Sequence, residues 1–217
     1  MIIIINNINH YKNIPKMSKI SDITNLSTLT RAMTFAADKH HNQKRKNKEQ
    51  TPYINHPIRV VNLLTGIGKI TDIPTLCAAV LHDTIEDTGT KYGEIKQEFG
   101  EEIADMVREV TDDKSLSKIE RKRLQIKNAP HKSTGAKLVK LADKLDNLLD
   151  LNLDAPVGWS ADAVHGYFVW AYKVVEGLRG TNAGLEDALD ALFQNKLVDG
   201  EDLDKSLENY YQLLESN

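Results

Sequence analysis

The chain has 217 residues, of which 41% are hydrophobic and 27% are charged, and its formal net charge is −3. These values fit one globular domain with a sizeable core, and the negative net charge argues against a general nucleic-acid binder. The one cysteine, Cys77, lies in an apolar run, so we expect a buried structural thiol and a reducing, cytoplasmic setting.

The N-terminal segment begins with the short apolar run Met1–Ile5. This run is too short for a secretory signal, no basic residue precedes it, and no small-residue cleavage site follows it. No segment approaches the roughly 20 consecutive apolar residues that span a bilayer. We therefore expect residues 1–25 to be a poorly ordered leader, and we expect no association with membranes.

Beyond this segment, apolar residues recur at the three-to-four spacing of helices, with little strand-like alternation. The predicted helices span 27–44, Pro57 to just before Gly66, Pro74–Asp83, 91–99, 101–110, 117–128 and 135–151. Ser160 and Asn182 are predicted N-caps of two further helices, the first ending at Gly180. The sequence thus predicts an all-α bundle over 26–195, followed by an amphipathic C-terminal helix within 196–217.

Four side chains of metal-ligating type occur along these helices: His56, His82, Asp83 and Asp143. Two imidazoles and two carboxylates form a mixed site for a divalent cation, which admits manganese or iron as readily as zinc. His82 and Asp83 end an apolar helix, where a buried ionised aspartate needs a charged partner or a metal. The pattern favours a metal-dependent hydrolase.

Two further carboxylates, Glu86 and Asp87, follow His82 and Asp83 by four residues and therefore project from the same helical stripe. They stand where a base or a water-orienting group is needed. Two of the proposed ligands also have a simpler interpretation: His56 as a helix cap or core residue, and Asp143 as part of a solvated acidic face. In the functional interpretation Asp143 lines a cleft, with Asn147 one turn beyond it, and periodicity favours neither interpretation.

Basic residues flank this constellation in two clusters: Lys44, Arg45, Lys46 and Lys48, then Lys114, Lys118, Arg121, Lys122 and Arg123. Charge runs are usually solvated surface. Beside a metal site, however, they suit a substrate that carries several phosphates. There is no Walker-type glycine loop, so side chains and a metal would hold the phosphates.

Five phrases of the sequence, at 40–46, 52–57, 82–87, 110–114 and 140–147, resemble the HD-type hydrolase domain of RelA/SpoT proteins. Within that family the chain is most similar to the stand-alone small alarmone hydrolases of the metazoan SpoT-homologue type, over about 27–195. The resemblance implies an all-α HD fold with one divalent ion, usually Mn2+, with Fe, Co or Zn as alternatives. It also implies hydrolysis of (p)ppGpp to pyrophosphate and GDP or GTP, without synthesis.

The resemblance also implies residue roles. His56, His82, Asp83 and Asp143 become the metal ligands, and Glu86 and Asp87 position the attacking water. The implied substrate contacts are Arg45, Lys46, Lys118, Asn147 and Tyr167. Members of the metazoan type are also associated with removal of the 2′-phosphate of NADPH, which is the alternative enzymatic hypothesis. A third hypothesis, of another class, is a module that binds the alarmone without hydrolysing it. The sequence gives no oligomeric state.

The chain departs from the family pattern at a few positions. Asp146 stands where relatives carry Tyr or His, and Leu149 where many carry Arg or Met. We expect Asp146 to add negative charge near the site, weakening nucleotide affinity or altering base preference. About 20 C-terminal residues have no counterpart in the resemblance, whereas all the metal and acid–base positions are retained.

Overall fold

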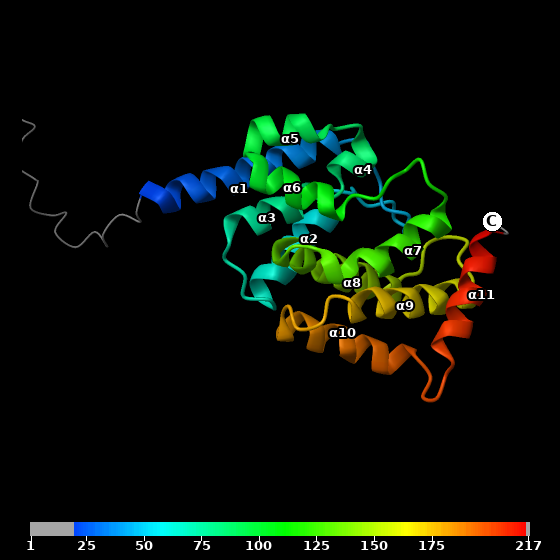
Figure 1. The fold of residues 1–217 in the computed structure, drawn as a ribbon. Coiled ribbons are helices and arrows are strands. Elements are labelled where there is room, and N and C mark those ends of the chain that lie inside the picture. The colour runs from blue at the N-terminus through cyan, green and yellow to red at the C-terminus, as the bar shows by residue number, and fades with distance from the viewer. Residues whose placement is uncertain (1–19, 216–217) are drawn as a thin grey trace, which may run out of the picture.

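The computed structural model describes residues 20–215, and Figure 1 shows that the regular structure in this range is helical. The helices are α1 (Ile20–Lys39), α2 (Asn55–Gly66), α3 (Ile73–Leu81), α4 (Thr84–Thr88), α5 (Tyr92–Phe99), α6 (Glu101–Val110), α7 (Lys118–Asn128), the short 3₁₀ helix η2 (Ala129–His131), α8 (Thr134–Leu153), α9 (Ala161–Glu176), α10 (Ala183–Lys196) and α11 (Leu203–Glu215). The predicted all-α class is confirmed.

Helix α8 runs through the middle of the bundle and contacts α2, α3, α6, α9 and α10 (Figure 1). Because helices surround it, its central turns are buried on nearly every face. Asp143 and Asp146 are only 6% and 2% exposed. The solvated acidic face considered for Asp143 is therefore wrong, and these charges need partners inside the protein.

Side-chain caps fix where several helices begin. The Ser160 hydroxyl accepts a hydrogen bond from the Ala163 amide at 3.1 Å, and the side-chain Oδ1 of Asn182 accepts one from the Leu185 amide at 3.0 Å. Each cap satisfies an amide that has no partner within its own helix. The two predicted N-caps are thus confirmed.

Helix ends differ more from prediction. Helix α1 ends at Lys39 rather than near residue 44, because the chain turns back on itself over 40–53. There the Arg45 amide donates to the Thr51 carbonyl at 2.9 Å, and the Tyr53 amide donates to the Gln43 carbonyl at 3.0 Å. The first basic cluster therefore lies on a loop. Helix α9 ends at Glu176 rather than Gly180, which instead completes the following turn with a positive φ of 76°.

The two ends of the described chain compare differently with expectation. Helix α1 begins at Ile20, so the end of the expected leader is helical, while residues 1–19 lie outside the described part of the chain. The predicted C-terminal helix is present as α11, which packs across α9 and α7 at one end of the bundle (Figure 1). Over the described residues, no helix combines the length and apolarity that crossing a bilayer requires.

Candidate metal centre and adjoining pocket

Two buried histidines direct one ring nitrogen each toward the same point. His56 lies in the first turn of α2, and its Nδ1 donates to Asp146 Oδ2 at 2.6 Å. His82 lies at the end of α3, and its Nδ1 donates to the Ala79 carbonyl at 2.8 Å. These bonds place the proton of each ring on Nδ1. Both Nε2 atoms are consequently available as ligands.

Two carboxylates complete the centre. Asp143 Oδ1 lies 3.3 Å from His56 Nε2 and 3.7 Å from His82 Nε2. Asp83 Oδ2 lies 2.9 Å from His82 Nε2 and 3.7 Å from His56 Nε2. Ligand atoms of His56, His82 and Asp143 all fall within 4.8 Å of one another. Asp83 joins this group through its contacts with both imidazoles, and the Tyr53 hydroxyl orients it by donating to Oδ2 at 2.6 Å.

The donor set fits a divalent metal. His82 Nε2 is buried and has no hydrogen bond of suitable geometry, although it lies close to Asp83 Oδ2. A buried polar atom without a partner is costly, and a metal bound between the two imidazoles and the carboxylates would satisfy it. Mixed imidazole and carboxylate ligands suit Mn, Fe, Co or Zn.

The electrostatics of the centre favour positive charge. Burial alone would lower the pKa of His82, but the Asp83 and Asp143 carboxylates outweigh it and raise that pKa to about 10. Burial would raise the pKa of Asp143, but Lys144 and the two histidines hold it well below its usual range. Lys144 donates to Asp143 Oδ2 at 2.9 Å. The pair of carboxylates thus stays ionised around a point that attracts a cation.

Glu86 and Asp87 lie on the short helix α4, next to Asp83. Glu86 Oε2 accepts a hydrogen bond from the Asp112 amide at 3.0 Å, and Glu86 Oε1 lies 3.1 Å from Lys114 Nζ. Asp87 accepts hydrogen bonds from Lys114 and from Gln43, each at 3.0 Å. Burial raises the pKa of Glu86 above its ordinary value, the direction that favours a group that takes up a proton.

These carboxylates open onto a cavity of about 460 Å³. Its walls include Asp83, Glu86, Asp87, Arg45, Lys46, Tyr53, Asn147, Asp150, Trp159 and Tyr167. Arg45 reaches across it to Asn147 Oδ1 at 3.0 Å and to Asp150 Oδ2 at 2.7 Å. Asn147 in turn donates to Asp143 Oδ1 at 2.7 Å, so one hydrogen-bonded chain joins the cavity wall to the metal centre.

Of the five predicted substrate contacts, Arg45, Lys46, Asn147 and Tyr167 line this cavity, and Lys118 does not. Lys118 lines a separate surface depression at the start of α7. Its pKa is lowered by partial burial and then by the charges of Lys46 and Arg121, which places the three cations close together.

The second basic cluster does not face the cavity as a unit. Lys114 pairs with Glu86 and Asp87, whereas Lys122 is buried with its Nζ 3.3 Å from the centre of the Trp170 ring. Arg123 lies at the surface beside Glu208. Only part of the cluster is therefore available to phosphates.

Sequence reasoning missed Arg59 and the contacts that Asp146 makes at the site. Asp146 was expected to add negative charge near the site, and it does lie there, where it accepts hydrogen bonds from His56 and Arg59 without lining the cavity. Leu149, the other departure from the family pattern, is 36% exposed. The available signal was spacing: Arg59 follows His56 by three residues, and Asp146 follows Asp143 by three, so each pair shares one face of its helix.

Comparison with known proteins agrees with this geometry. The HD domain family model matches residues 32–165. Human guanosine-3′,5′-bis(diphosphate) 3′-pyrophosphohydrolase MESH1 is 58% identical over 168 residues, covering 77% of this chain and 94% of that protein. The Drosophila melanogaster protein of the same name is 52% identical over 164 residues, covering 76% of this chain and 92% of that protein.

A solved structure, described as a metazoan ortholog of SpoT that hydrolyses ppGpp and plays a role in starvation responses, matches with a TM-score of 0.77 at 50% identity. The match covers 79% of this chain and 96% of that chain. The five sequence phrases, the helical bundle and the paired histidines and aspartates agree with one another. The chain therefore belongs to the HD-domain family, and within it to the stand-alone hydrolases of the metazoan SpoT-homologue type.

Proposed function

We propose that the chain is a metal-dependent (p)ppGpp 3′-pyrophosphohydrolase that yields pyrophosphate and GDP or GTP. The observation that carries this proposal is the juxtaposition of His56, His82 and Asp143 with a cavity that holds both carboxylates and basic groups. The human and Drosophila relatives bear the name of this activity, and the match to this chain covers 94% and 92% of their lengths. We further propose Mn2+ as the ion, with Fe, Co or Zn as alternatives, and Asp83 as the fourth protein ligand.

In the proposed reaction, water attacks the phosphorus attached to the 3′ oxygen of the ribose. The bond from this phosphorus to the 3′ oxygen breaks, and the 3′ oxygen takes up a proton as pyrophosphate is released. A divalent ion at the centre would supply Lewis-acid polarisation of the water and of the phosphate oxygens. Glu86 accepts the proton of the attacking water, and Asp87 holds Lys114 in place beside it.

The rest of the cavity supports nucleotide binding. Arg45 and Lys46 stand on the loop that follows α1, where their charges can hold the 5′ and 3′ phosphates. Trp159 and Tyr167 line the cavity with ring centres 5.7 Å apart, which gives the base an aromatic surface on which to stack. Asn147 connects the basic wall of the cavity to the metal centre, since it contacts both Arg45 and Asp143.

The test is pyrophosphate release from ppGpp by purified, metal-stripped chain with Mn2+ added back. Asp83→Ala serves as the metal-site control, and NADPH is assayed in parallel. We expect release that requires both Mn2+ and Asp83. Phosphate from NADPH without pyrophosphate from ppGpp would move the function to cofactor dephosphorylation. Tight ppGpp binding without any product would support a binding module instead.

A further inference from the structure

Asp146 makes a contact that the reaction itself does not explain. It projects from α8 toward the first turn of α2, and its side chain is 3% exposed. Its Oδ2 accepts the hydrogen bond from His56 Nδ1 at 2.6 Å. The carboxylate therefore lies behind the imidazole, on the side opposite the Nε2 atom that faces Asp83 and Asp143.

Arg59 holds this carboxylate in position. Its Nε donates to Asp146 Oδ1 at 2.7 Å, and one terminal nitrogen donates to Oδ2 at 2.9 Å. The same nitrogen reaches Asp150 at 2.6 Å, so the guanidinium is shared between two turns of α8. A two-point arginine contact fixes the plane of a carboxylate, and it also compensates the charge that Asp146 brings into the interior.

The two histidines of the centre are thus oriented by different acceptors. His82 donates to the neutral Ala79 carbonyl, whereas His56 donates to an ionised carboxylate. A carboxylate behind an imidazole fixes which nitrogen carries the proton and makes the other nitrogen a stronger donor to a metal. A purely structural ion pair between Asp146 and Arg59 would need no bond to His56.

We propose that Asp146 is a positioning residue for the metal, which acts through His56 to strengthen the binding of a divalent cation. The proposal rests on the metal-dependent function proposed above. Asp146 does not line the substrate cavity, so it acts on the metal and not on the nucleotide. Its removal should therefore weaken metal binding even when no substrate is present.

The experiment measures the Mn2+ dissociation constant of metal-stripped protein from the electron paramagnetic resonance signal of free Mn2+. Asp146→Asn is compared with Asp150→Asn, which removes the same charge from the same arginine without touching His56. We expect the dissociation constant to rise roughly 10- to 100-fold for Asp146→Asn and by less than about threefold for Asp150→Asn. Equal weakening in both variants, or none in Asp146→Asn, would overturn the proposal.

The asparagine amide would face the donors of Arg59, so folding is checked by circular dichroism. The double variant Asp146→Asn/Arg59→Gln removes that conflict, and we expect it to remain weak in Mn2+ binding. Affinity recovered in the double variant would instead assign the effect to Arg59. Because binding is measured without turnover, a wild-type chain that binds Mn2+ but does not cleave ppGpp would reject the proposed function alone.

Discussion

Lys144 places an ammonium group against the carboxylate of Asp143 in the interior of the bundle, where both side chains are almost fully buried. Replacing Lys144 with Met leaves that carboxylate without its cation. We expect the metal-free variant to lose about 3–5 kcal/mol of unfolding free energy, the usual cost of breaking a buried pair. Denaturant titration of metal-stripped protein measures this loss.

The same substitution should make stability more dependent on metal. A bound divalent ion would supply the positive charge that Lys144 provided, so Mn2+ should raise the melting temperature of Lys144→Met more than that of wild type. Lys137→Met on the same helix is the control, and we expect its unfolding free energy to stay within about 0.5 kcal/mol of wild type. Equal Mn2+-induced rises in melting temperature for wild type and Lys144→Met would show that the lysine does not compensate the carboxylate charge at the metal site.

Glu86 should set the acid side of the pH profile. Burial raises its pKa above 4.5, and only the ionised form can accept a proton from water. As the pH falls through this raised pKa, the ionised fraction and kcat should fall together, earlier than for an exposed carboxyl. Glu86→Gln should lower kcat by roughly 10²–10⁴-fold and abolish this acid limb while keeping its metal content. A variant that retains the wild-type pH profile would assign the proton transfer elsewhere.

The chemical types of the residues alone predicted much of the composition of the site, but not its geometry. The order of His56, His82, Asp83 and Asp143 predicted the metal centre, and the structure brings these side chains together. The partnership of Asp146 with His56 joins residues that are 90 positions apart. Such a contact depends on how α2 packs against α8, which periodicity within either helix does not contain.

At the scale of elements, helix starts were more predictable than helix ends. A capping side chain or a proline marks a start locally, as Ser160 and Pro57 do. The end of α1 depends instead on the backbone pairing of residues 43–53, which is a contact between segments. The same loop, whose first residues up to 44 were predicted to be helical, brings Arg45 and Lys46 to the cavity.

The packing of α11 on α9 depends on Gly166. A Cβ placed there would come within 2.5–2.6 Å of three side-chain atoms of Tyr210. We expect Gly166→Ala to separate the helices and cost about 1–3 kcal/mol of unfolding free energy through overpacking. Gly93→Ala in α5 is the matched control, because a Cβ there meets nothing within 4 Å and alanine favours the helix. Equal stability of the two variants would mean that α11 adapts without cost.

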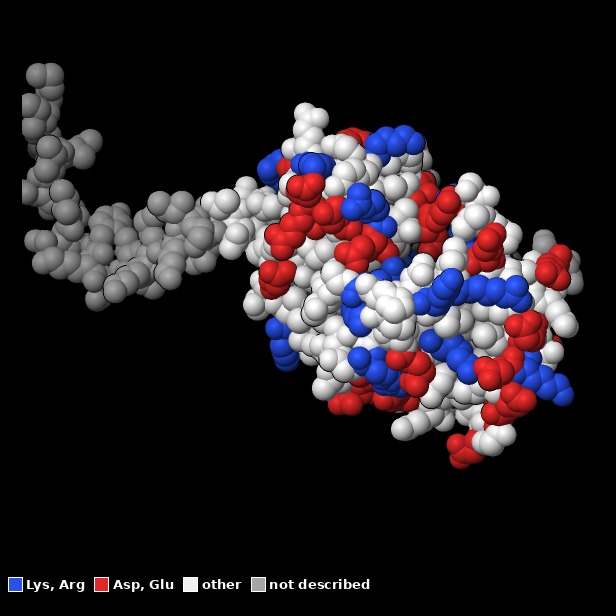
Figure 2. Space-filling model, in the orientation of Figure 1, with Lys and Arg blue, Asp and Glu red and all other residues white. Residues whose placement is uncertain are grey.

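At the scale of the whole molecule, charge is mixed rather than segregated. Figure 2 shows acidic and basic side chains interspersed over the face drawn there, consistent with a net charge of only −3. An anionic nucleotide therefore gains little from the overall field of the protein. Its attraction depends on local cations: Arg45 and Lys46 in the cavity wall, and Lys118 beyond it, whose pKa is lowered by partial burial and then by the charges of Lys46 and Arg121.

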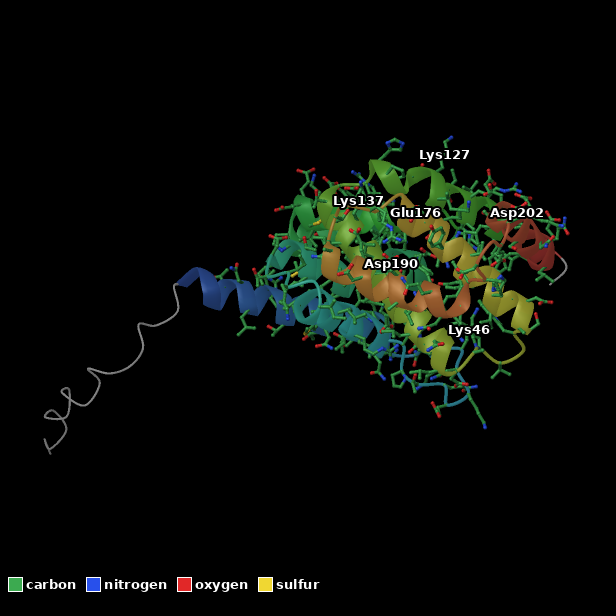
Figure 3. All side chains as sticks on the ribbon, turned by 90° about the horizontal axis from the view of Figure 1, so that it is seen from below. Lys46, Lys127, Lys137, Glu176, Asp190 and Asp202 are labelled. Carbon is green, nitrogen blue, oxygen red and sulfur yellow. The ribbon has the colours of Figure 1, made fainter. Side chains whose placement is uncertain are left out.

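This local attraction should be visible as a dependence on salt. Raising the ionic strength from about 0.05 to 0.5 M shortens the range over which exposed charges act, so kcat/KM for ppGpp should fall severalfold while kcat changes little. Lys118→Gln should lower kcat/KM at low salt and flatten the dependence. Lys127→Gln, at the other end of α7, is the control, since Lys127 and Lys46 lie on opposite sides of the molecule in Figure 3. If Lys127→Gln flattened the dependence as much as Lys118→Gln, the attraction would belong to the total charge and not to the group beside the cavity.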